Sequence, residues 1–162
     1  MARSPGSWDA FSALLEALKG IRGPASGYWT DLEGRVFTRD LDPGSGTPFP
    51  FGVLVMSSED PEEAVTDERH VESTQTIAAA FWLEDSSSDP GESSAIELAM
   101  KLRDDVRKAV HVVFRGADEN GVKDAEVLRT VVGAGAGGEQ PLATLECTIR
   151  WSQIQDLATL GP

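Results

Sequence analysis

The sequence predicts an α+β protein in which a single mixed or antiparallel β-sheet is packed by two main helices on one face. Two segments carry apolar residues at helical spacing, and several shorter segments alternate or form brief apolar runs, as strands do. The order is helix, two or three strands, helix, two strands, which is typical of α+β proteins. The 162 residues contain no evident linker, so we expect one domain over 1–162.

The first helix is expected at Trp8–Lys19. Its apolar residues recur at steps of three and four: Trp8, Phe11, Leu14, Leu15 and Leu18. Ser7 is the expected N-cap and Gly20 the expected end. A turn at Glu33-Gly34 and a short strand around Val36 should follow.

The next apolar run, Phe49–Met56, predicts a buried strand with Pro50 at its start. The segment Ser57–Arg69 is acidic, has little to bury and predicts a long exposed loop. Such a loop is either simply solvated or binds a cation or a basic partner, since loops often carry function. Its candidate contact residues are Glu59, Asp60, Glu62 and Glu63.

A second strand is expected at Val71–Leu83, with Val71, Ile77, Ala79, Phe81 and Leu83 on one side. The other side is polar at first and then becomes Ala78, Ala80 and Trp82. Half of this strand is therefore expected to be covered on both faces. Trp82 is a candidate anchor of a subunit contact, and the alternative is that it packs under a helix of its own chain.

The second helix should begin at a capping box formed by Ser94 and Glu97. Its expected buried stripe is Leu98, Leu102, Val106, Ala109 and Val113. Beyond it the sequence predicts a turn at Gly116–Asp124 and a strand at Ala125–Val132. A glycine-rich loop at Gly133–Pro141 and a final alternating strand at Ala143–Trp151 should follow. Residues 152–162 are expected to form a C-terminal extension that docks on a neighbour through Ile154, Leu157 and Leu160.

Charge and composition exclude several classes of function. There are 27 acidic and 14 basic residues, so the net charge of −13 disfavours binding to nucleic-acid phosphates. The single cysteine, Cys147, and the two histidines, His70 and His111, give no zinc-like cluster. The longest apolar runs are far shorter than the ~20 residues that span a bilayer. We therefore expect no cofactor, no metal, no membrane contact, and assembly in a reducing cytoplasm.

Three weak signals of chemistry have simpler explanations. Gly133–Gly138 has the spacing of a dinucleotide loop, but a strand follows where that motif needs a helix. Asp118–Glu126 resembles a calcium loop with its glycine misplaced, and its Asn120-Gly121 pair predicts a turn. Cys147 lies on the apolar side of its strand, so a buried thiol is expected rather than a nucleophile. No catalytic residues are assigned, and the chain is not expected to be an enzyme.

The order and spacing of these segments resemble the small tail-terminator, or tail-completion, proteins of long-tailed bacteriophages. The resemblance runs from Phe11 to Trp151 and rests on Leu18–Ile21, Tyr28, Gly34–Phe37, Thr47–Val55, Ser73–Phe81, Leu102–Val110 and Leu145–Trp151. None of these is a catalytic signature.

The resemblance implies a mixed sheet backed by helices and a homo-oligomeric ring of six copies. This ring would cap the head-proximal end of the tail tube in the virion, end its polymerisation and join it to the head. Its partners would be the major tail-tube protein and a neck or head-connector protein, and DNA would pass through the channel without specific binding. The alternatives are a neck or head–tail connector protein, a soluble host regulatory or interaction domain, or a small ligand-binding domain or enzyme.

Overall fold

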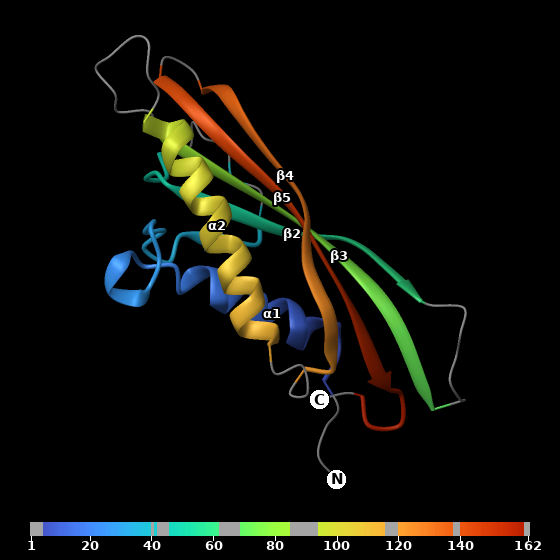
Figure 1. The fold of residues 1–162 in the computed structure, drawn as a ribbon. Coiled ribbons are helices and arrows are strands. Elements are labelled where there is room, and N and C mark those ends of the chain that lie inside the picture. Colours follow the sequence, from blue (N-terminus) through green and yellow to red (C-terminus); the bar gives the residue numbers. More distant parts are fainter. Residues whose placement is uncertain are drawn as a thin grey trace.

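The computed structural model describes residues 5–39, 41, 46–61, 69–84, 94–115, 120–137 and 140–160. They form one five-stranded mixed sheet with two α-helices packed on one of its faces (Figure 1), so the predicted fold class is confirmed. The elements are α1 (Ser7–Lys19), the 3-10 turn η1 (Pro24–Ser26), β1 (Val36–Phe37), β2 (Phe51–Pro61), β3 (His70–Glu84), α2 (Ser94–Phe114), β4 (Val122–Gly137) and β5 (Gln140–Asp156).

The sheet order is β1-β2-β3-β5-β4. Only β1 runs parallel to its neighbour, and the long β2, β3, β5 and β4 pair antiparallel. The alternation predicted for the two central strands is confirmed, because Ile77 lies opposite Ile149 and Phe81 opposite Leu145, all four buried beneath the helices. Val71, expected on the same apolar side, is only half-buried.

Helix α1 ends at Gly20 as predicted, but it begins one residue earlier than expected. Gly6 is its N-cap, and the Gly6 N–H donates to the Asp9 carboxylate at 2.7 Å. Ser7, predicted as the cap, lies inside the helix and donates its hydroxyl proton to Glu59 of β2. Trp8 was expected in the buried stripe but is exposed, stacked on Phe11.

Helix α2 begins at Ser94, so the residue predicted as its N-cap is the first residue of the helix, and the buried stripe is shifted as well. Leu98 is exposed and Val113 only half-buried, whereas Ala95, Ala99 and Asp105 are buried. The small alanines let the helix lie close to the sheet, while a buried aspartate on this face was not expected.

Two segments predicted as loops belong to the sheet over part of their length. The acidic loop predicted at Ser57–Arg69 is wrong in its first part, because β2 continues to Pro61 and pairs with Ser73–Thr76 after a register shift. The glycine loop predicted at Gly133–Pro141 is also wrong, since β4 continues to Gly137 and β5 begins at Gln140. Ladder hydrogen bonds use only the backbone, so apolar side chains are not required to extend a pair. Residues 62–68, 116–119, 138 and 139 lie outside the described part of the chain.

The final strand also runs further than predicted, to Asp156 rather than Trp151. A buried amide cluster explains the extension: the Gln75 amide donates to Gln153 at 2.7 Å, and the Trp151 indole N–H donates to Gln75 at 2.7 Å. Gln153 in turn donates to the carbonyl oxygens of Gly6 and Asn120. Because these buried polar groups are paired, the polar end of the strand stays in the sheet. The expected extension 152–162 is therefore strand over its first five residues.

Candidate functional site

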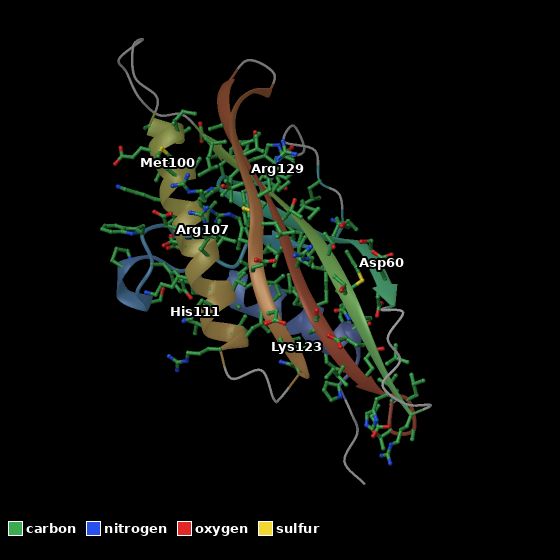
Figure 2. All side chains as sticks on the ribbon, turned by 45° about the vertical axis from the view of Figure 1, so that its right-hand side comes forward. Asp60, Met100, Arg107, His111, Lys123 and Arg129 are labelled. Carbon is green, nitrogen blue, oxygen red and sulfur yellow. The ribbon has the colours of Figure 1, made fainter. Side chains whose placement is uncertain are left out.

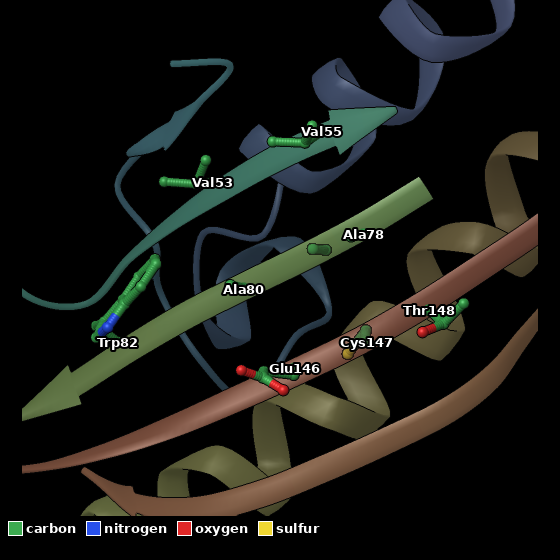
Figure 3. Close-up of a pocket in the computed structure, with 9 residues that line it drawn as sticks. Val53, Val55, Ala78, Ala80, Trp82, Glu146, Cys147 and Thr148 are labelled. Carbon is green, nitrogen blue, oxygen red and sulfur yellow. The ribbon is translucent and has the colours of Figure 1, made fainter. Parts of the chain in front are cut away.

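The sheet face opposite the helices is the first candidate site, and we call it the open face. Because neighbouring strands are in register, Val55, Ala78 and Thr148 form one row across it, and Val53, Ala80 and Glu146 form the next. With Trp82 they line an open hollow of about 370 Å³ (Figure 3), backed by Ala79 and Cys147. No described helix covers this face, whereas the sequence suggested that it would be covered.

The hollow exists because small side chains lie between larger ones. Ala78 is exposed and Ala80 half-buried in the middle of the sheet, with valines on one side and a threonine and a glutamate on the other. Trp82 forms one wall. Its ring stacks on Phe51, with centroids 5.1 Å apart, and Phe51 is fully buried. Trp82 is thus held in place on the open face and does not pack under a helix.

Beyond Thr148 the open face becomes polar. A second hollow of about 320 Å³ is lined by Thr74, Asp124, Glu126, Arg150, Trp151 and Ser152. Arg150 forms an exposed ion pair with Glu126 at 2.8 Å. An apolar centre with a polar border is the usual anatomy of a protein–protein contact surface.

Cys147 lies behind the hollow and turns toward the helices, where it is buried. Burial raises the pKa of its thiol to about 12, although Arg107 and Arg103 nearby act in the opposite direction. The thiol is therefore protonated and shielded at neutral pH. This confirms the prediction of a buried core cysteine.

A second exposed surface lies on the helix side of the molecule, in the loop between α1 and β1 (Figure 1). Trp29 is 67% exposed there, next to Tyr28, and the Nζ atoms of two α2 lysines lie over the rings: Lys101 at 5.6 Å from the Trp29 centroid and Lys108 at 5.1 Å from that of Tyr28. We call Tyr28, Trp29, Lys101 and Lys108 the Trp29 patch. Figure 2 shows Met100, Arg107 and His111 continuing along α2, all three exposed.

The loop that presents Trp29 is anchored by the buried Asp105. The Asp105 carboxylate accepts the Trp29 N–H at 3.0 Å, the Thr30 N–H at 2.8 Å and the Thr30 hydroxyl at 2.6 Å. Gly23 and Gly27 flank the turn at φ +84 and +87, which side chains rarely adopt. Sequence reasoning missed this patch. Two features of the sequence could have indicated it: the Tyr-Trp pair in a polar loop and an aspartate on the apolar side of α2.

The predicted acidic residues do not form one site. Glu59 accepts hydrogen bonds from Ser7 at 2.6 Å and more weakly from Ser73, Gln75 and Gln155, so it ties α1 to the sheet. Asp60 is exposed opposite Thr74. Glu62 and Glu63 lie outside the described residues.

The three apolar residues of the expected extension do not form one stripe either. Ile154 belongs to β5 and is 43% exposed, at the polar end of the open face. Leu157 is exposed in the following turn, where its N–H donates to the Arg69 carbonyl oxygen. Leu160 is half-buried beside Gly6. The expected extension is wrong over 152–156, which belong to β5, and its three apolar residues therefore do not share one surface.

Comparison with known protein families and with curated protein sequences found no match to this chain. Within the described ranges, no three His, Cys, Asp or Glu side chains gather closely enough to hold a metal ion. None of the helices there is long and apolar enough to cross a membrane.

Proposed function

We propose that this protein is a structural component of a bacteriophage tail that assembles into a ring and caps the head-proximal end of the tail tube. The open face is the observation that carries the proposal. Its centre is apolar, it includes a fixed tryptophan, and no described helix of the same chain covers it. Apolar surface of this kind marks a place where another protein binds.

The fold suits a ring subunit. One compact layer of helices and one sheet leave two opposite faces for neighbours, and a head-to-tail contact that closes on itself gives a ring. The resemblance in segment order to tail-terminator proteins gives six copies. In that role one side of the ring matches the end of the tube and the other presents a new surface to the neck, so polymerisation stops.

The charge of the chain supports a channel through which DNA passes without being held. A protein with a net charge of −13 repels phosphates unless its few cations gather on one surface. We propose that acidic side chains, with exposed Asp60 among them, face this channel. Assembled rings should not retain duplex DNA at low salt, and strong retention would contradict this assignment.

Deleting the gene in the phage tests the terminator role. The expected result is unjoined heads and tails, with tubes of irregular and excessive length under the electron microscope. Tails of normal length that stay unjoined would contradict the terminator role and favour a neck connector. Normal-length tails already joined to heads would exclude both.

A further inference from the structure

We infer that two copies of this chain bind each other through unlike surfaces, the Trp29 patch of one copy docking on the open face of the next. The inference deepens the proposed function, since it says how the subunits of the ring would meet. It requires only that the chain self-associates, and it would hold for any head-to-tail assembly of this protein.

The two surfaces are complementary in chemistry. The open face offers an apolar hollow whose lining includes one carboxylate, Glu146, and no cation. The Trp29 patch offers an exposed indole ring with an ammonium group beside it. Copies with a charge of −13 repel one another, so a stable contact needs local cations, and two of the four lysines in the sequence lie in this patch.

The hollow is also large enough for an indole ring. Hollows of about 300 Å³ or more accommodate ring-sized groups, and the open-face hollow of about 370 Å³ lies in that range. Trp29 and Trp8 are the two most exposed aromatic side chains among the described residues. The exposed fraction is 67% for Trp29 and 64% for Trp8. Lys101 beside the indole and Glu146 beside the hollow carry opposite charges, so we expect them to pair across the contact.

The ion pair that Lys101 would give up on docking is weak. Lys101 pairs with Glu97 at 2.8 Å, one helical turn away, and the two side chains are 41% and 68% exposed. Such pairs contribute little and are readily exchanged. The backbone at Trp29, by contrast, is already held by Asp105, so docking does not have to order this loop.

The positions of the two surfaces determine the type of contact. The open face lies on one side of the sheet and the Trp29 patch lies on the opposite, helix side (Figure 1). The two surfaces of one copy therefore cannot bind each other. Each copy therefore offers one of each to two different neighbours. This is a heterologous contact, which propagates into rings or filaments and cannot stop at a symmetric dimer.

Mixing two single variants of the full chain tests the inference. Trp29→Asp removes the indole from the patch, and Ala78→Arg fills the hollow at an exposed strand position. Each variant alone should remain monomeric by native mass spectrometry at concentrations where the wild type assembles, with self-association weakened about thirtyfold or more. Their mixture should form a one-to-one heterodimer, since the intact patch of one variant meets the intact open face of the other.

A matched control is Trp8→Asp, which removes the other highly exposed tryptophan and should leave assembly unchanged. Circular dichroism shows whether each variant is folded. If a variant misfolds, cysteine cross-linking replaces the mixing test. Met100→Cys leaves the indole in place at an exposed position of α2 beside Lys101, and Met100→Cys and Thr148→Cys chains should form a disulfide when mixed under oxidant, whereas neither should do so with itself. The native Cys147 is buried and does not compete.

The outcomes separate this inference from the proposed function. A heterodimer or the mixed disulfide supports the inference whatever the phage deletion shows. A wild type that assembles while the folded variants stay monomeric when mixed overturns the inference and leaves the ring intact. A wild type that is monomeric at all concentrations overturns both.

Discussion

Replacing Asp105 by alanine should destabilise the protein far more than any exposed acidic substitution. Asp105 is 2% exposed and holds three donors of the Trp29 loop. Thr30 is 5% exposed, so its N–H and hydroxyl would lose their partner away from water. Each buried group left unpaired costs about 1–3 kcal/mol, whereas the N–H of exposed Trp29 can bind water.

The expected loss for Asp105→Ala is therefore about 3–4 kcal/mol of the free energy of unfolding. With a urea m-value of about 2 kcal/mol per molar, the midpoint should fall by roughly 1.5–2 M. Asp105→Asn, which keeps one acceptor oxygen, should lose less. Both are measured by urea unfolding at one protein concentration, because self-association adds to stability.

Asp104→Ala is the matched control. Asp104 is the neighbouring aspartate on the same helix, its side chain is 57% exposed, and its ion pairs with Arg103 and Arg107 are long, at 3.5 and 3.8 Å. Its loss should change stability by no more than about 0.5 kcal/mol. An Asp105→Ala protein within about 1 kcal/mol of the wild type would refute the assignment of Asp105 as the anchor of the loop.

Three further changes have defined outcomes. Gly52→Ala places a Cβ 2.5 Å from the Phe81 ring, so thermal unfolding should show a loss of about 1–3 kcal/mol. Cys147, with its pKa raised to about 12, should resist thiol reagents at pH 8 until urea is added, and its contribution to stability should be lost as pH rises above about 9. Hydrogen bonds from Arg69 lower the pKa of Asp156 to about 2, so Arg69→Ala should raise it toward 3.8 by carboxyl NMR.

Each of these three predictions has a result that would contradict it. Gly133→Ala, whose Cβ would meet only the Thr144 hydroxyl at 3.3 Å, should be far milder than Gly52→Ala, and equal losses would contradict the packing at Gly52. Rapid labelling of native Cys147 would contradict its burial. An Asp156 pKa that is the same with and without Arg69 would show that the ion pair does not form in solution.

The sequence by itself determined the fold class and the helix and strand cores. Phe11, Leu14 and Leu18 repeat at helical spacing, and the apolar residues Leu145, Cys147 and Ile149 alternate with polar ones. This local periodicity predicts which side of each element is buried. Apolar residues must leave water wherever the element lies in the fold. The two strand cores and α1 were therefore predictable without knowing their neighbours.

The ends of the strands were decided only by the tertiary structure. Residues 57–61 and 152–156 have few apolar side chains, and nothing local distinguishes them from loop. They extend the sheet because Glu59 and Gln153 meet donors and acceptors far away in the chain, such as Ser7 and Gln75. A polar residue is stable in a buried strand only when its partner is present, and the partner is set by pairing between distant segments.

The two candidate surfaces also depended on long-range contacts. The sequence placed Ala78, Ala80 and Trp82 on one side of a strand, but only the packing of both helices on the opposite face leaves that side open. Trp29 is presented because Asp105, 76 residues away, binds its backbone N–H. Local sequence fixes which side of an element is apolar, whereas which apolar side remains uncovered is a property of the whole fold.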